Sequence, residues 1–194
     1  MPRAGLSTAV VVAGAAEIAD EVGLDRLTLA MVAKRFGVAL PSLYKHVEGL
    51  DALLQKVSAL AIAELAEELV AAAAGLAGAD ALRAMAAAQR AYAKRHPGRY
   101  PAAQRVPDPA GPAPVAAGEK AVGVSFAVLR GYGFDGDDLI DATRAVRSAI
   151  HGFVTLEIAG GFGLPRDVDR SFERLVDMLH EGNRVAAQAR RLRS

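Results

Sequence analysis

The sequence predicts an all-α protein in which a small N-terminal domain of three helices precedes a larger helical domain. Apolar residues recur at spacings of three and four along most of the chain, which is the period of an amphipathic helix. Breaks rich in glycine and proline, such as those at 75–78 and 160–165, separate these segments and should end the helices. A chain of 194 residues can bury a sizeable core in one or two domains.

The composition limits the kinds of protein that this chain can be. It contains no cysteine, so disulfides and thiolate metal ligands are excluded, and a reducing cytoplasm suits it. The net charge is only +1, so affinity for nucleic acid would have to come from a local patch. Residues 26–47 hold four basic residues and no acidic one, which places such a patch there. For some of the four, a solvated helix face is the plainer explanation.

The first helix should begin after an N-cap at Ser7 or Thr8 and end near Gly23. Its apolar stretch at 9–16 could be mistaken for a secretory signal, but the helical spacing of apolar residues runs straight through it. The same stretch does not open a dinucleotide-binding turn, because the further glycines that such a turn requires are alanines. No run approaches the ~18 apolar residues of a membrane span. We therefore expect a cytoplasmic protein.

A helix, a tight glycine turn and a second helix are predicted between Thr28 and Val47. Thr28 is a good N-cap, and the apolar spacing after it predicts a short helix that ends before Gly37. The next helix should begin at Ala39 or Leu40, with a proline in its first turn, where proline costs no hydrogen bond. This succession is the helix-turn-helix pattern. Its exposed positions carry side chains that can donate hydrogen bonds to phosphates or base edges: Ser42, Tyr44, Lys45 and His46.

Several short motifs accompany this pattern. They are Leu27-Thr28-Leu29, Val32-Ala33, Gly37-Val38 and, above all, Leu43-Tyr44-Lys45-His46-Val47 followed by Leu53-Leu54. With these motifs, residues 24–54 resemble the N-terminal DNA-binding domain of TetR-family transcriptional regulators. The resemblance implies a helix-turn-helix DNA-binding domain at 1–48 and a helical regulatory and dimerisation domain at 49–194. The residues expected to contact an operator in double-stranded DNA are Thr28, Ala39, Leu40, Pro41, Ser42, Tyr44, Lys45 and His46.

One position departs from the family pattern. In TetR-like proteins the helix after the motif usually begins with a lysine that grips a DNA phosphate, and here Leu50 occupies that position. The backbone amides of the helix N-terminus could still hold the phosphate. Whether the loss of a basic residue at Leu50 weakens DNA binding stays open.

The rest of the chain predicts further helices separated by breaks. We expect helices at about 50–74, 81–94 and 115–130. The six prolines between 97 and 114 allow only a short helical piece at 102–105 and then a mobile loop at 107–114. Acidic residues at 135–138 favour the start of a long helix that reaches 158, and Asp167 should start the last helix. The apolar stripe of the 138–160 helix is wide, which suggests burial on two sides. We therefore expect a two-fold homodimer built from the last two helices.

A second set of motifs marks the C-terminal part. His151-Gly152-Phe153, Leu156-Glu157, GGFGLP at 160–165 and Ser171-Phe172 resemble the C-terminal domain of a TetR subgroup with an aromatic-His-Gly type motif. This resemblance covers about 138–179 and implies a cavity for a small-molecule effector among the alanine-rich helices. A medium-sized, mostly apolar ligand, which could be anionic, would reach it under the 107–114 loop. The expected lining is Met85, Gln89, Tyr92, Phe126, Arg130 and His151.

No set of residues supports catalysis, a metal site or a cofactor. The four histidines lie on different predicted elements, and no cysteine could complete a metal site. Ser148 and His151 are one helical turn apart, but a hydrolase needs an exposed G-x-S-x-G elbow, which the sequence around Ser148 lacks. We expect a DNA-binding regulator, most often a ligand-responsive repressor in this family. The alternative is an all-helical small-molecule-binding protein or enzyme whose N-terminal helices, including Tyr44 and His46, are structural only. The operator, the effector, the controlled genes and the sign of regulation stay open.

Overall fold

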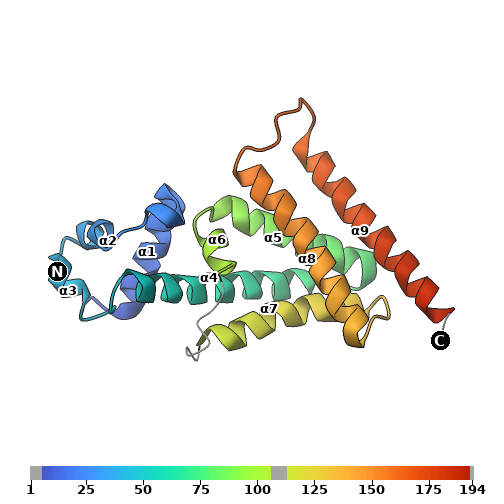
Figure 1. The fold of residues 1–194 in the computed structure, drawn as a ribbon, viewed down its shortest axis with the longest axis horizontal. Helices are drawn as coiled ribbons and strands as arrows, with labels where there is room; N and C mark the ends of the chain where they lie inside the picture. Colours follow the sequence, from blue (N-terminus) through green and yellow to red (C-terminus); the bar gives the residue numbers. More distant parts are fainter. Residues whose placement is uncertain (1–5, 106–112, 193–194) are drawn as a thin grey trace. The chain divides into compact units, whose positions relative to one another are not determined.

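All regular secondary structure in the described part of the chain is helical (Figure 1). The computed structural model describes residues 6–105 and 113–192, and for residues 113–117 it describes the backbone alone. The expectation of an all-α fold is confirmed. The helices are α1 (Thr8–Val22), the 3-10 helix η1 (Leu24–Arg26), α2 (Leu29–Phe36), α3 (Leu40–Leu43), α4 (Leu50–Ala73), α5 (Gly78–Arg95), α6 (Arg99–Ala103), α7 (Ala113–Arg130), α8 (Gly136–Ile158) and α9 (Val168–Arg191).

The chain forms two compact units. The first comprises Met1–Leu65 with Arg95–Gly118, and the second comprises Ala66–Lys94 with Glu119–Ser194. The first unit therefore contains α1, η1, α2, α3, the N-terminal part of α4, α6 and the N-terminal end of α7. The second unit contains most of α5 and α7 together with all of α8 and α9. No helix among the described residues is long and apolar enough to cross a lipid bilayer.

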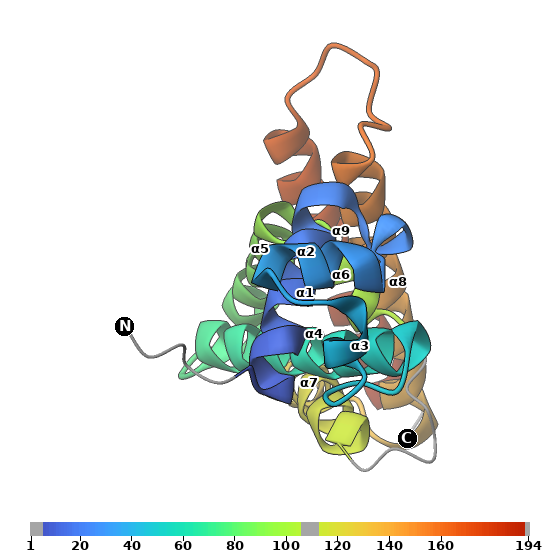
Figure 2. The same ribbon diagram turned by 90° about the vertical axis from the view of Figure 1, so that its left-hand side faces the viewer.

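The first unit is built around one hydrophobic core. Figure 2 shows the helices of this unit from the side of α2 and α3. Fully buried side chains come from α1, α2, α3, α4 and α6, so the three N-terminal helices, α4 and α6 share a common interior. The short α6 takes part although more than 50 residues separate it from α3 in the sequence. Members with 0% exposure include Val11, Ala15, Ala16, Ala19, Val32, Leu43, Leu53, Val57, Ala61 and Ala102.

The second unit holds the α8–α9 pair, whose helices pack against each other. Buried side chains on one face of each helix, such as Ile150 on α8 and Val176 on α9, supply the apolar contact. Both ends of the pair are tied by polar contacts. At the C-terminal end of α9, Arg190 forms ion pairs with Asp135 and Asp138 at the start of α8.

Four predicted boundaries differ from the structure. Helix α5 begins at Gly78 and not at about 81, so the last residue of the predicted 75–78 break is helical. The short helical piece expected at 102–105 lies at Arg99–Ala103, because contacts from α1 to the backbone amides of Gly98 and Arg99 fix its start. Helix α7 begins at Ala113 and not at about 115, so the end of the predicted 107–114 loop is helical. Residues 107–112 of that loop lie outside the described residues. The fourth difference, at α3, concerns the motif itself.

Candidate nucleic-acid interface

Helix α2 begins and ends where the sequence predicts. The Thr28 hydroxyl accepts a hydrogen bond from the Met31 amide at 3.2 Å, which satisfies one of the free amides at the helix start. At the other end Gly37 adopts the left-handed conformation, with φ 61° and ψ 34°. The Val38 amide then bonds to the Ala33 carbonyl at 3.0 Å, which closes the turn. The glycine turn of the predicted motif is therefore confirmed.

Helix α3 is shorter than predicted. Regular helix covers only Leu40–Leu43, and Tyr44 to His46 form a turn. The Leu43 carbonyl explains the change, because it accepts from the amides of both His46 at 2.8 Å and Val47 at 3.0 Å. Sharing one carbonyl tightens the last turn towards 3-10 geometry, as is common at helix ends. The path stays helical enough to bury both Leu43 and Val47, so the predicted inward face is correct.

The predicted DNA-contacting residues are brought together on one short segment, apart from Thr28 at the start of α2. Leu40 is 38% exposed and Tyr44 is 54% exposed, although both are large side chains with apolar surface. Together with the exposed Pro41 and Lys45 they form one solvent-facing segment. Thr28, Ala39, Pro41 and Lys45 are also exposed, whereas Ser42 and His46 are half-buried.

The positive charge of the motif is smaller than the count of basic residues suggests. Arg35 forms ion pairs with Glu17 and Glu21 of α1, at 3.2 and 2.5 Å, so its charge is balanced within the unit. Lys45, in contrast, is exposed and makes no hydrogen bond or ion pair within residues 6–105 and 113–192. Lys34 is exposed as well. Arg35 is therefore a bracing residue, and Lys45 is available to a phosphate or a base.

Helix α1 braces the motif at two further points. The Thr8 hydroxyl donates a hydrogen bond to the His46 carbonyl at 3.2 Å, which ties the end of the recognition turn to the start of α1. At Gly14 the helix leaves room for the ring of Phe36, since a β-carbon there would lie 2.5 Å from Cζ of the ring. Sequence reasoning missed both contacts. A glycine within a helical pattern was the available signal for the second, because such glycines often mark a close approach.

Leu50 is the first residue of α4 and is half-buried. No cationic side chain stands at this helix start, and the acidic Asp51 follows it. The free amides of the first turn of an α-helix attract anions without any side chain. A phosphate could therefore be held here by the backbone, at a site weakened by the neighbouring carboxylate.

The predicted ligand-contacting residues lie in the second unit. Met85, Gln89 and Tyr92 are buried along one face of α5. The Ser125 hydroxyl of α7 donates to the Met85 sulfur at 3.7 Å, which brings the neighbourhood of Phe126 against α5. The groove that the structure describes in the first unit is lined by other residues, namely Ile18, Glu21, Val22, Met31, Lys34 and Arg35.

The remaining predicted ligand residues lie nearer the surface. Arg130 is exposed, and its guanidinium carbon lies 5.6 Å from the centre of the Phe126 ring, a cation–π contact. His151 on α8 is half-buried, and its Nδ1 lies 3.4 Å from the Thr155 hydroxyl. Burial, together with the nearby charge of Arg147, lowers the pKa of the His151 imidazole. His151 is therefore favoured in its neutral form, which can both donate and accept hydrogen bonds.

Comparisons with known proteins agree with this geometry. Residues 82–179 match the family model described as the tetracyclin repressor-like C-terminal domain. An uncharacterized HTH-type transcriptional regulator of Mycobacterium tuberculosis is 40% identical over 158 residues, which cover 81% of this chain and 72% of that protein. The regulator YobS of Bacillus subtilis, also named an uncharacterized HTH-type transcriptional regulator, is 30% identical over 167 residues, 86% of this chain and 87% of that protein.

Solved structures share the fold. A crystal structure of a TetR variant from Acinetobacter baumannii in complex with minocycline has a TM-score of 0.70 and 25% identity. The match covers 98% of this chain and 99% of that one. The likeness therefore extends over the N-terminal helices and the C-terminal helices alike.

Proposed function

Because this chain belongs to the TetR family of DNA-binding transcriptional regulators, we propose that it is a ligand-responsive repressor that binds its operator as a homodimer. The observation that carries the proposal is the exposed segment Leu40–His46, held in place by the buried side chains of Leu43 and Val47. Members of the family are regulators and not enzymes, so the alternative of a helical enzyme is set aside. DNA contact is assigned to residues 1–48, and ligand binding and dimerisation to residues 49–194.

The recognition segment would lie in a major groove. Lys45 and Ser42 can donate to base edges, while the exposed apolar surface of Leu40 and its neighbour Pro41 suits the methyl groups of thymine. Tyr44 would hold a phosphate through its hydroxyl, as would His46 and the N-cap residue Thr28, with Ala39 close to the DNA at the turn. These contacts combine few charges with many neutral donors, which suits a chain of net charge +1.

The ligand would bind among the alanine-rich helices of residues 49–194. Three observations support this placement. The buried face of α5 carries the polar Gln89 and Tyr92 among apolar residues, and neutral His151 adds a donor and an acceptor. Binding pockets typically combine an apolar wall with a few such polar groups. The TetR variant with bound minocycline shows that a relative of the same fold accommodates a small molecule. The proposed lining is therefore Met85, Gln89, Tyr92, Phe126, Arg130 and His151.

The homodimer would be formed by α8 and α9. Their surfaces expose large apolar side chains, including Leu156 at 52% and Met178 at 64%. Gly152 and Gly182 lie inside these helices, and a β-carbon at either would meet nothing within 4 Å. A glycine inside a helix costs about 0.5 to 1 kcal/mol relative to alanine. Close approach by a helix of a second copy at these points would explain why both positions carry glycine in spite of this cost.

The test of the proposed function is operator binding. A DNA duplex would first be selected in vitro from a random library with the full-length protein. Lys45→Ala should weaken binding to this duplex by about 1 to 3 kcal/mol, because a base or phosphate contact is lost. The matched control is Lys120→Ala on α7, a lysine whose partner is Glu67 in the second unit. Failure of the wild-type protein to enrich any sequence, or equal affinity of the Lys45→Ala and wild-type proteins, would contradict the proposal.

A further inference from the structure

An open groove lies between α1 and α2 in the first unit. Its volume is about 320 Å³, and most of its surface is apolar. This volume is at the lower end of the range found for small-molecule sites, about 300 to 1,000 Å³. The residues that line the groove are Ile18, Glu21, Val22, Met31, Lys34 and Arg35. None of them belongs to the DNA-contacting or ligand-contacting sets named above.

Three apolar side chains form the larger part of the groove surface. Ile18 and Val22 lie one turn apart on α1 and also take part in the core of the unit, which fixes their positions. Met31 lines the groove from α2 and is 38% exposed. A methionine side chain is unbranched and flexible, so it adapts to ligands of different shapes. An alkyl chain laid over these side chains would remove apolar surface from water, which favours binding.

The charged side chains of the groove are not equivalent. Arg35 forms ion pairs with both Glu17 and Glu21 of α1, so these three charges are balanced among themselves. Lys34, in contrast, is exposed, and its ammonium group makes no hydrogen bond or ion pair with the residues that the structure describes. The groove therefore combines an apolar surface with one unpaired cation. This combination complements a molecule with an apolar chain and a single anionic group.

The unpaired cation lies on the same helix as a predicted DNA contact. Thr28, Met31 and Lys34 follow one another at spacings of three residues, so they lie along one side of α2. Thr28, the N-cap of this helix, is a predicted phosphate contact. Six residues of α-helix span about 9 Å, which is close to the Debye length of about 10 Å at about 0.1 M salt. An anion held by Lys34 is therefore within electrostatic range of a phosphate at Thr28.

We propose that this groove is a second small-molecule site, which binds a medium-chain monocarboxylate and thereby weakens operator binding. The alkyl chain covers Ile18, Val22 and Met31, and the carboxylate pairs with Lys34. The bound anion neutralises Lys34 and repels the nearby phosphates, so the ligand and DNA oppose each other's binding. The effect on DNA rests on the function proposed above, whereas the site itself does not.

The first experiment measures ligand binding to the full-length protein without DNA, by two-dimensional NMR of the backbone amides. The probes are decanoate, the shorter anion butyrate, and decyltrimethylammonium, which has the same alkyl chain and the opposite charge. Decanoate should shift the signals of residues 18–22 and 31–35 with a Kd below about 1 mM. Butyrate should bind at least about tenfold more weakly because it buries less apolar surface. Decyltrimethylammonium should bind at least about threefold more weakly because Lys34 repels it.

Two variants separate the contribution of charge from that of the apolar surface. Lys34→Gln should weaken decanoate binding by at least about threefold and remove the preference for decanoate over decyltrimethylammonium. Met31→Gln should also weaken decanoate binding but keep this preference, because Lys34 stays in place. The matched control is Lys56→Gln. Lys56 is an exposed lysine of α4 in the same unit that does not line the groove, so this variant should bind decanoate as the wild type does.

Three results would overturn the site. Shifts confined to residues 81–95 would place decanoate among the ligand contacts proposed in the second unit. Equal binding of decyltrimethylammonium, or unchanged decanoate affinity in Lys34→Gln, would show that the cation does not select the ligand. Shifts in residues 18–35 that follow protein concentration in the absence of any probe would assign the groove to a second copy of the chain.

The second experiment tests the effect on DNA. Saturating decanoate should weaken binding of the wild-type protein to the selected duplex by at least about threefold at about 50 mM salt, and by less at about 300 mM, because salt screens the charges. Lys34→Gln should show a smaller loss at the same decanoate concentration. An equal loss in Lys34→Gln, or no loss in the wild type while the groove signals shift, would overturn the regulatory role.

The two experiments keep the two proposals distinguishable. If the wild-type protein selects no DNA, the proposed function fails, and the binding experiment still decides whether the groove takes a carboxylate. If the protein selects DNA and decanoate leaves the groove signals unchanged, the site is overturned and the proposed function stands.

Discussion

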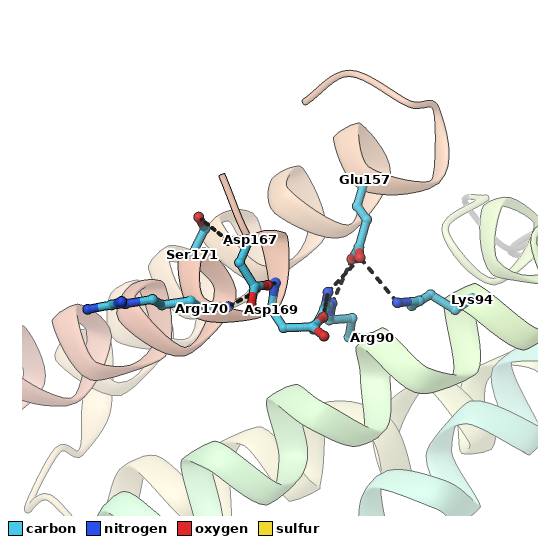
Figure 3. Close-up of polar contacts among 7 residues, drawn as sticks. All are labelled: Arg90, Lys94, Glu157, Asp167, Asp169, Arg170 and Ser171. Atoms are coloured by element: carbon cyan, nitrogen blue, oxygen red, sulfur yellow. Dashed lines mark hydrogen bonds and ion pairs between the residues drawn. The ribbon is translucent and has the colours of Figure 1, made fainter. Parts of the chain in front are cut away.

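Removing the charge of Arg90 should destabilise the second unit more than any exposed ion pair can. Figure 3 shows Arg90 of α5 between the carboxylates of Glu157 on α8 and Asp169 on α9. Its Nε and Nη2 atoms donate to the two oxygens of Glu157 at 2.6 and 2.5 Å, and Nη2 also reaches Asp169 at 2.5 Å. The guanidinium carbon lies 4.8 Å from the centre of the Phe172 ring. One side chain therefore joins three helices.

The expected magnitude follows from the burial of the pair. The side chains of Arg90 and Glu157 are 12% and 13% exposed, so neither can regain full hydration when its partner is removed. Breaking a buried pair from one side costs about 3 to 5 kcal/mol. Lys94, 3.3 Å from Glu157, stays in place and offsets part of the loss. For Arg90→Met, which keeps an unbranched apolar chain over Phe172, we expect about 2 to 4 kcal/mol.

Urea unfolding of the full-length protein, followed by circular dichroism, measures this loss. The control is Arg83→Met, which removes an exposed arginine that also bridges α5 and α9 through Asp177. Exposed ion pairs contribute little, so the control should unfold at nearly the wild-type urea concentration. If Arg90→Met and Arg83→Met lower the midpoint of urea unfolding equally, the Arg90–Glu157 pair does not stabilise the fold more than an exposed ion pair does.

The same pair predicts a pH dependence. Hydrogen bonds from Arg90 hold the pKa of the Glu157 carboxyl below its ordinary range, although burial acts in the opposite direction. A carboxyl with a depressed pKa in the folded state stabilises the fold above its unfolded pKa, and this contribution is lost as the pH falls through the folded pKa. The loss of unfolding free energy in Glu157→Gln should therefore be largest near neutral pH. It should shrink as the pH falls below about 4.3, the ordinary pKa of glutamate.

Three further changes test other parts of the structure. Gly14→Ala should lower stability by about 1 to 3 kcal/mol in thermal unfolding, because the ring of Phe36 must move; an unchanged melting temperature would refute the contact. Leu50→Lys should tighten operator binding and steepen its salt dependence by about 0.9 per added phosphate contact in a log–log titration, whereas an unchanged slope would show that no phosphate lies at this helix start. Gly182→Ala should raise the helix stability of the monomer yet weaken the dimer in sedimentation, and a tighter dimer would contradict close approach at α9.

Local signals in the sequence predicted most helix boundaries correctly. The N-caps Ser7, Thr28 and Asp167 accept the expected backbone hydrogen bonds, and Gly37 has the left-handed conformation that a helix-ending glycine requires. These features act within a few residues of the chain, which is why periodicity and capping rules suffice to find them. The inward positions of the motif, Leu43 among them, follow from the same periodicity.

Long-range contacts account for the errors. The start of α6 depends on Asp20, which is 78 residues away from Gly98, and no local pattern marks that pairing. Likewise, the two glutamates that bind Arg35 precede it by 14 and 18 residues on another helix. A count of basic residues in a window cannot show which of them are already paired. The sequence therefore placed four basic residues in 26–47, and the structure shows that one of them, Arg35, is paired with α1.

This lower free charge bears on how the protein finds its operator. Sequence-independent binding to DNA depends mainly on the phosphates that lysines and arginines neutralise. With Arg35 bound to α1, the unpaired lysine of the recognition segment is Lys45, next to the neutral donor Tyr44 and the exposed apolar Leu40. Hydrogen bonds from a neutral donor and apolar contacts depend on the chemistry and shape of the groove more than on charge. If the proposed contacts are made, we expect weak attraction to random DNA and therefore a higher ratio of specific to non-specific binding, which decides occupancy when most sites in a genome are competitors.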